Sequence, residues 1–303
     1  MGSSLTTIGL PVALGIVMFG LGLTLTVGDF ARIGRQPKAV VIALVCQLIL
    51  LPAVCFGLVL AFSLPPVLAV GMMLLAASPG GTTANLYSYL FRGDVALNIS
   101  LTAINSVIAV VTLPLIVNFS IGYFMAGEEQ VGIQLGKFVE VFAIVLLPVL
   151  LGMLVRRLRP AFARSMDKPV RIASVIILVL VVAGSIIANR TLLVENFGSL
   201  SGITVVFCVC SLAVGYLVPR LLKVSRPQSI ASSFEIGIHN ATLAIVIAQT
   251  VIGSVEMSLP AGVYGVLMFF VAAAFGFLIK GAPAKAAPGN VSDATATGES
   301  PAR

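Results

Sequence analysis

Hydrophobic residues fall into long runs along most of this chain, and short polar segments separate them. Most runs reach the length of about 20 residues that a helix needs to cross a bilayer. The pattern predicts an all-α polytopic membrane protein with no cleaved signal peptide. Its nine spans are expected at 6–28, 39–62, 67–91, 95–117, 133–155, 169–189, 199–219, 228–252 and 258–280.

Composition agrees with this prediction. The 303 residues are 59% hydrophobic and 10% charged, with a mean hydropathy of +1.12, whereas a soluble domain is about 25% charged. The membrane domain is expected to occupy 1–280. The Ala-, Pro-, Gly- and Ser-rich residues 281–303 are expected to be a disordered tail.

The distribution of charge predicts an orientation. With nine spans, all of the 18 lysines and arginines except Lys137 and Arg190 fall on one side of the membrane. The basic side is expected to be the cytoplasmic side of the cell inner (plasma) membrane, which places the N-terminus outside and the C-terminus inside. The net charge of +7 therefore reflects topology and does not indicate a nucleic-acid partner. The segment 118–132 is expected to be an outer loop.

The third span is interrupted by SPGGTTANLY, residues 78–87. Pro79 removes a backbone donor, and Gly80 and Gly81 release the chain from helical geometry. Breaks at membrane depth are tolerated where protein or a water-filled cavity satisfies the freed backbone groups. We expect two half-helices, about 67–78 and 82–91. An ordinary proline kink is the alternative, which the following polar residues disfavour.

The eighth span carries the most deeply placed carboxylate, Glu235. A charge at this depth costs at least about 2.5–3.5 kcal/mol and normally has a partner. Because no lysine or arginine is predicted at that depth, a metal cation or a proton is the remaining candidate. His239 and Thr242 follow at i+4 and i+7, which predicts one shared helix face, although Gly237 weakens the helix between them. A protonated structural glutamate is the alternative.

Other polar residues extend the candidate cation site. Asn98, Thr102 and Asn105 form a stripe along the fourth span, and Gln47 is an isolated amide in the second. The stripe alone is equally typical of interhelical hydrogen bonding, and an isolated amide such as Gln47 more often serves that purpose than binding. Together with Glu235 they supply mainly hard oxygen donors, which suit a small hard cation. We expect Na⁺, with H⁺ as the second possibility.

The eighth span, like the third, is predicted to be interrupted, and these two spans are five apart and run in opposite directions. This arrangement is typical of inverted-topology repeats, whose binding sites form where broken helices meet. Two five-helix repeats would give ten spans, so the first repeat is expected to lack its first helix.

Four stretches carry a resemblance to a known family. They are LGIVMFGLGLTL with a following DF (14–30), QLILLP (47–52), SPGGTTANLYSYLFRGDVALNISLT (78–102) and FEIGIHNATLA (234–244). In these stretches the chain resembles the bile acid:sodium symporter family, and its bacterial members in particular. The resemblance covers nearly the whole chain, from the first span to the ninth. The N-terminus outside makes it similar to the nine-span vertebrate members.

The resemblance implies a panel of helices (6–28, 133–155 and 169–189) against which a core (39–117 and 199–280) moves. It also implies two Na⁺ sites behind crossed broken helices. The first would use Asn85, Asn98, Thr102 and Glu235, with Ala84 where the family usually has a serine.

The second implied Na⁺ site would use Gln47, Glu235 and the backbone carbonyls near Ile236 and Ile238. Its last ligand in the family is a glutamine, where this chain has His239. Imidazole nitrogen is a poorer Na⁺ ligand than an amide oxygen.

An organic anion is the implied substrate, contacted by Thr82, Thr83 and Asn240. The expected function is sodium-coupled import of that anion by alternating access. Alternatives are a proton-coupled carrier with Glu235 and His239 as the relay, an uncoupled channel, or a membrane sensor. No enzymatic activity is expected, since no nucleophile or second carboxylate accompanies Glu235. No phosphate-binding loop is evident. The substrate and the oligomeric state stay open.

Overall fold

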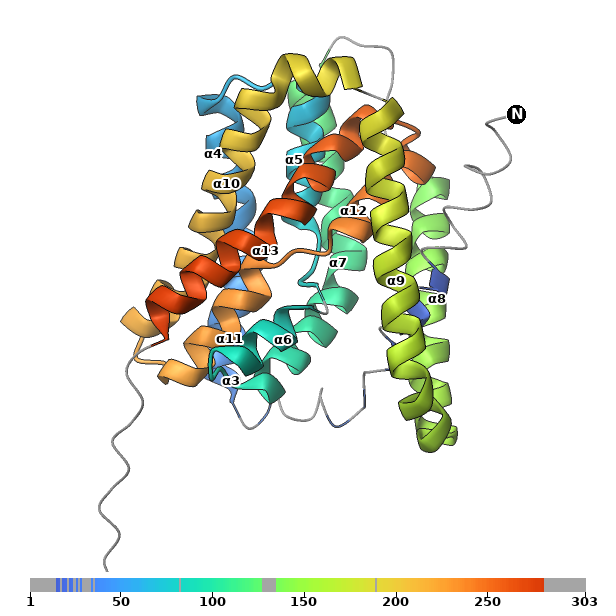
Figure 1. Cartoon of the computed structure of the whole chain (residues 1–303), viewed down its shortest axis with the longest axis vertical. Coiled ribbons are helices and arrows are strands. Elements are labelled where there is room, and N and C mark those ends of the chain that lie inside the picture. Colours follow the sequence, from blue (N-terminus) through green and yellow to red (C-terminus); the bar gives the residue numbers. More distant parts are fainter. Residues whose placement is uncertain are drawn as a thin grey trace, which may run out of the picture.

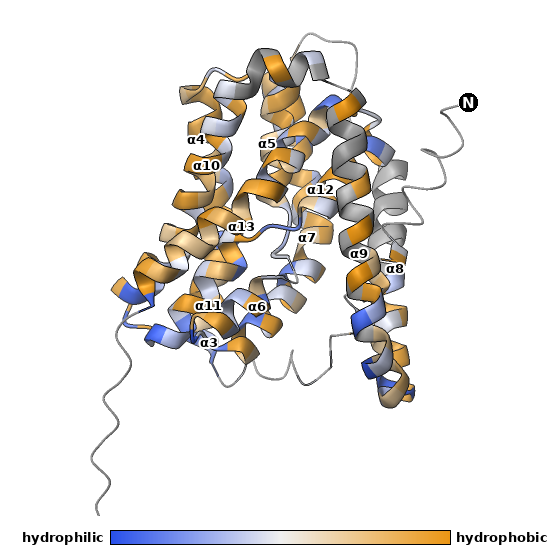
Figure 2. Ribbon diagram, viewed as in Figure 1, coloured by the Kyte–Doolittle hydropathy of each residue, from blue (hydrophilic) through white to orange (hydrophobic). Residues whose placement is uncertain are grey.

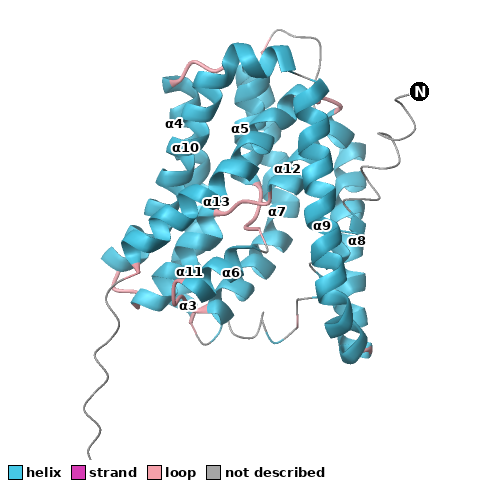
Figure 3. Ribbon diagram, in the orientation of Figure 1, coloured by secondary structure: helices cyan, strands magenta, loops and turns pink. Residues whose placement is uncertain are grey.

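The computed structural model describes residues 36–81, 83–126, 135–188 and 190–280, with scattered positions between 15 and 34. Helices carry nearly all of these residues, and short loops join them (Figure 3). Most of the first predicted span lies outside the described residues. Thr82 and the predicted tail lie wholly outside them.

Four described helical stretches are long and apolar enough to cross a membrane: 37–61, 95–124, 198–221 and 256–279. They coincide with the second, fourth, seventh and ninth predicted spans. Figure 2 shows hydrophobic residues along most of their length and hydrophilic ones chiefly at helix ends and in a central loop. The chain is therefore an α-helical multi-pass membrane protein.

The second span consists of α3 (Pro37–Val45), a π-helical turn η2 (Cys46–Leu50) and α4 (Leu51–Ala61). The π-turn ends two residues before Pro52, which has no N–H to continue the regular pattern of hydrogen bonds. Such turns within helices are often found at functional sites. Gln47 lies inside this turn.

The third and eighth spans are both broken, as predicted. The third consists of α5 (Pro66–Ala77) and α6 (Thr83–Leu90). The eighth consists of α11 (Arg226–Gly237), α12 (Ala241–Val246) and a π-helical segment η3 (Ile247–Ile252). Figure 1 shows the two breaks near the middle of the molecule, between α5, α6, α11 and α12.

The two breaks satisfy each other's backbone groups. Residues 79–81 and 238–240 form an antiparallel bridge. The Gly81 N–H donates to the Ile238 carbonyl (2.6 Å), and the Asn240 N–H donates to the Pro79 carbonyl (2.9 Å). Irregular backbone can lie inside a membrane protein when the chain itself supplies such partners.

The remaining long helices are α7 (Val95–Phe124), α8 (Leu135–Leu158), α9 (Pro160–Ala188), α10 (Arg190–Leu221) and α13 (Leu259–Ile279), with a short turn η4 (Glu256–Ser258) before α13. The predicted bounds of several were too short. Residues 118–124, predicted to begin an outer loop, are helical, and α9 and α10 start earlier than expected. The predicted spans stop where polar residues end an apolar run. Many polar residues are compatible with a helix, so the helices continue past those points.

Helices α8 and α9 lie side by side at one edge of the molecule (Figure 1). The described residues of the first predicted span contact this pair. The Arg156 guanidinium donates to the Leu23 carbonyl at 3.2 Å, and the backbones approach closely where Gly22 meets Val149 and Gly152. The other helices pack around the two breaks.

Candidate functional site at the helix crossing

Glu235 lies in the last turn of α11 and is fully buried. It is the only buried carboxylate among the described residues, and no described lysine or arginine is buried. Its carboxylate accepts hydrogen bonds from the Thr102 hydroxyl (2.5 Å) and the Asn105 amide (3.3 Å). The Gly80 backbone also donates to it. None of these three groups carries a positive charge, so they hold the carboxyl group in place without supplying a countercharge.

Two of these donors come from the polar stripe on α7. Asn98, Thr102 and Asn105 are all buried and face α11. Asn98 donates its amide to the Ala231 carbonyl at 2.7 Å. Asn105 belongs to the predicted polar stripe, but the Na⁺ ligand set implied by the family resemblance did not include it. Its contact with Glu235 depends on how α7 and α11 pack, which one sequence does not give.

Several buried amide oxygens on the helices around the crossing have no hydrogen-bond partner. Among the described residues, these buried oxygens belong to Gln47, Asn85, Asn98 and Asn105. An unsatisfied buried acceptor costs roughly 1–3 kcal/mol, so four within the packed helices around the crossing need an explanation. Amide and carboxylate oxygens are the donors that hard cations prefer. The donor set therefore fits Na⁺.

The break between α5 and α6 links Gln47 and His239. Both side chains point at the Ser78 carbonyl, from Gln47 Nε2 at 3.1 Å and from His239 Nδ1 at 3.3 Å. The other imidazole nitrogen, Nε2, is buried without a partner. The carbonyl of Ile238 already accepts the Gly81 N–H, and Ile236 is fully buried.

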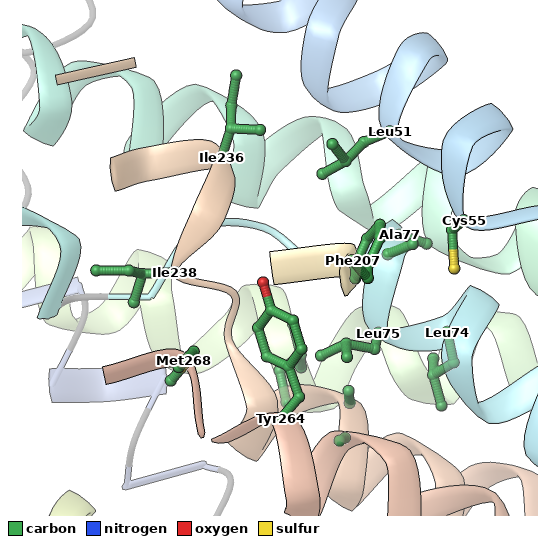
Figure 4. Close-up of a cluster of buried hydrophobic side chains, with 14 of the residues drawn as sticks. Leu51, Cys55, Leu74, Leu75, Ala77, Phe207, Ile236, Ile238, Tyr264 and Met268 are labelled. Atoms are coloured by element: carbon green, nitrogen blue, oxygen red, sulfur yellow. The ribbon is translucent and has the colours of Figure 1, made fainter. Parts of the chain in front are cut away.

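Aromatic rings enclose the imidazole. His239 stacks on Phe207, with ring centroids 5.5 Å apart at 15°, and meets Tyr264 edge-on at 5.4 Å. The Tyr264 hydroxyl donates to the Gly237 carbonyl at 2.9 Å, which α11 leaves free where it ends. Figure 4 shows Tyr264 pointing its hydroxyl toward the segment between Ile236 and Ile238. Nothing in the sequence pattern marked Tyr264, a single tyrosine in an apolar span.

The prediction that Glu235, His239 and Thr242 share one helix face is wrong. Helix α11 ends at Gly237 and α12 begins at Ala241, so the three residues belong to a helix, a loop and a second helix. The Cβ of an alanine at 237 would overlap Leu212. Glycine is therefore required here for close packing against α10.

Of the three predicted substrate contacts, Thr82 lies outside the described residues. Thr83 is the first residue of α6 and is partly buried. Asn240 caps α12, where its side chain accepts the Leu243 N–H at 3.0 Å. Thr83 and Asn240 thus lie at the starts of the two half-helices that follow the breaks.

Comparison with known proteins decides the family. The model of the sodium bile acid symporter family matches residues 11–196 of this chain. The chain belongs to that family. This confirms the resemblance expected from the sequence. The crossing of α5–α6 with α11–α12 is therefore described in a member of this family.

Three relatives illustrate the similarity. An uncharacterized sodium-dependent transporter, YocS of Bacillus subtilis, is 31% identical over 241 residues, which cover 78% of this chain and 72% of YocS. A probable chloroplastic sodium/metabolite cotransporter, BASS2 of rice (Oryza sativa subsp. japonica), is 27% identical over 85% of this chain and 60% of its own length. The human ileal sodium/bile acid cotransporter is 27% identical over 79% and 68%. These relatives are transporters by name.

Proposed function

We propose that this protein is a sodium-coupled symporter that imports a small organic anion by alternating access. The observation that carries the proposal is Glu235, a buried carboxylate without a cationic partner among the described residues, held where two broken helices cross. The names of its relatives, which include a sodium-dependent transporter and a sodium/bile acid cotransporter, support the same conclusion.

The first Na⁺ is proposed to bind Glu235, Thr102 and the amide oxygens of Asn85 and Asn98. The unpartnered state of both amide oxygens supports this assignment. Asn105, whose amide oxygen is also unpartnered, is added to the predicted set. Ala84 cannot supply the hydroxyl that a serine would offer to the ion. We propose that the Asn105 amide oxygen takes its place as a ligand.

The second Na⁺ is proposed to bind between Gln47 and Glu235, with the carbonyls of Ile236 and Ile238. The unpartnered Gln47 oxygen supports this assignment. His239 is the weakest member of the set, because its Nδ1 is directed to Ser78 and its ring is stacked on Phe207.

Coupling follows from electrostatics. A Na⁺ ion at Glu235 neutralises the buried charge and ties α6, α7 and α11 together. The starts of α6 and α12 carry the positive ends of helix dipoles, which favour an anion. We propose that an anionic substrate binds there, against Thr82, Thr83 and Asn240. With Glu235 unneutralised, the same anion would be repelled.

The proposed architecture has nine spans in two inverted repeats, with α8, α9 and the first span as the panel. The remaining helices form the core that moves against it. The basic ends of α6, α10 and α11 support a cytoplasmic location for that face of the protein in a plasma (bacterial inner) membrane.

A flux experiment tests the proposal. Purified protein is reconstituted into proteoliposomes and screened with labelled organic acids under an inward Na⁺ gradient without a pH gradient. Concentrative uptake that disappears when choline replaces sodium is the expected result. Uptake that follows a pH gradient and ignores sodium would favour the second candidate, a proton-coupled carrier, which the unpartnered Nε2 of His239 supports. Dissipative flux would indicate a channel, and binding without flux a sensor.

A further inference from the structure

A small pocket lies just beyond the helix crossing, between α7 and the segment formed by α12 and η3 (Figure 1). It has room for a particle the size of a water molecule, and a bare sodium ion is smaller than that. Ser106, Val110 and Pro114 on α7 line one side, and Leu243 and Ile247 line the other. Every one of these residues is buried. The pocket therefore belongs to the interior of the protein and not to its lipid-facing surface.

Pro114 leaves a carbonyl on the wall of this pocket without its helical hydrogen bond. In an α-helix each carbonyl points along the axis to the N–H four residues later, and proline has no N–H to offer. The carbonyl of Val110 therefore lacks its helical donor, and it points along α7 between two residues that line the pocket. A buried carbonyl normally has a partner. A water molecule or a cation in the pocket can supply one.

Ser106 supplies a second oxygen and connects the pocket to the carboxylate. Its hydroxyl donates to the Thr102 carbonyl at 2.7 Å, so the lone pairs of the hydroxyl oxygen remain able to bind an ion. One turn earlier on α7, the Thr102 hydroxyl donates to Glu235. The neighbour of Ser106 in the sequence, Asn105, also donates to Glu235 and keeps an unpartnered amide oxygen. Hard oxygens, which sodium prefers, thus continue from the Val110 carbonyl to the carboxylate over about 12 Å of helix.

The pocket lies farther than Glu235 from the basic end of the core. The starts of α7 and α11 meet at that end, where the Asp94 N–H donates to the Pro227 carbonyl at 2.9 Å. Further along both helices, Thr102 meets Glu235. The two helices therefore run parallel, and Ser106 lies one turn beyond this second contact. In the orientation of the proposed function, the pocket is on the outer side of the sodium site.

We propose that this pocket is the outer entrance to the sodium site. An ion that arrives from outside meets the Val110 carbonyl first, then the Ser106 hydroxyl and then Glu235. The first two oxygens replace part of the hydration shell of the ion while it passes the apolar side chains of Leu243 and Ile247. They take no part in the bound state, so they change how fast sodium exchanges and leave its dissociation constant unchanged. The inference rests on the proposed function, which assigns Na⁺ to Glu235 and the cytoplasm to the basic end.

The kinetics of radioactive sodium exchange with the purified protein test this entrance. In Pro114→Ala, the new backbone N–H can bond the Val110 carbonyl and so removes one oxygen from the path. The association and dissociation rates should fall together by about tenfold, which corresponds to about 1.4 kcal/mol on the barrier, and the dissociation constant should stay unchanged. Pro219→Ala is the matched control, because it removes a proline from inside α10 near its basic end. It should exchange sodium at the wild-type rate.

A second variant narrows the pocket itself. Ala109 also lines it, and Ala109→Leu fills the space without altering either oxygen. Both rates should fall again. The matched control is Val111→Phe, which adds bulk to α7 at a position that is 54% exposed and should leave the rates unchanged. Melting temperatures of all four variants check that each is folded.

Wild-type exchange rates in either Pro114→Ala or Ala109→Leu would overturn the entrance while leaving sodium binding at Glu235 intact. A changed dissociation constant in Pro114→Ala would also overturn it, because the Val110 carbonyl would then belong to the bound state. A wild-type protein that binds no sodium would instead refute the proposed function.

Discussion

A methyl group at Gly80 has no room beside the carboxylate of Glu235. The Cβ of an alanine would lie 2.7 Å from the Glu235 backbone oxygen and closer still to the carboxylate itself. The side chain can rotate away, but the backbone oxygen cannot. Gly80→Ala must therefore separate the two breaks and displace the carboxylate from Thr102.

The magnitude follows from these contacts. Overpacking of this kind costs about 1–3 kcal/mol of folding free energy. A hydrogen bond to a charged group contributes about 1.5–3 kcal/mol, and the Thr102 bond at 2.5 Å is the shortest that Glu235 accepts from a side chain. Because 1.4 kcal/mol is a tenfold change in affinity, Gly80→Ala should weaken sodium binding at least about tenfold. Binding of radioactive sodium to purified protein measures the loss.

Two other glycines provide graded controls. At Gly81 a Cβ would come no closer than 3.1 Å, to the His239 carbonyl, and at Gly57 on α4 nothing lies within 4 Å. Gly81→Ala should give an intermediate loss of affinity. Gly57→Ala should leave sodium binding unchanged and stabilise the helix slightly. A Gly80→Ala protein that binds sodium as tightly as Gly57→Ala would refute the proposed geometry of the crossing.

Three further substitutions probe the same site. Tyr264→Phe removes the hydroxyl from the Gly237 carbonyl, so thermal unfolding should show a loss of about 1 kcal/mol; an unchanged melting curve would contradict this role. Asn105→Ala removes a donor from Glu235 and a free oxygen, so the sodium dissociation constant should rise, and equal affinity would exclude Asn105 from the site. His239→Gln supplies an amide oxygen in place of a stacked imidazole, so uptake should depend more steeply on sodium concentration; an unaltered Hill coefficient would argue against a second site there.

The sequence predicted the helix breaks of this fold better than the helix ends, because a break depends on the residues at that position. Pro79, Gly80 and Gly81 break a helix wherever they stand, so the interruption of the third span was expected at the correct place. The eighth span was also expected to be interrupted and to be weakened at Gly237, but one helix face was still predicted from Glu235 to Thr242. The helix ends at residues 124, 160 and 190 were missed, because hydropathy reports where a helix meets lipid and not where its hydrogen bonds stop.

The candidate site was predicted only as far as single side chains reveal it. Glu235 and the stripe from Asn98 to Asn105 are polar residues in apolar spans, which any hydropathy profile detects. The pairing of Asn105 with Glu235 and the bond from Tyr264 to Gly237 arise from helix packing between segments distant in sequence.

The central claim is that Glu235 holds a sodium ion at the crossing, and sodium binding by Glu235→Gln tests it most directly. The amide has nearly the same shape as the carboxylate and can still accept from Thr102 and Asn105, so the variant should fold. Isothermal titration of purified protein with NaCl, in buffer with choline as the only other cation, should give saturable binding for the wild type and none for Glu235→Gln. Sodium binding of wild-type affinity in Glu235→Gln would contradict the account.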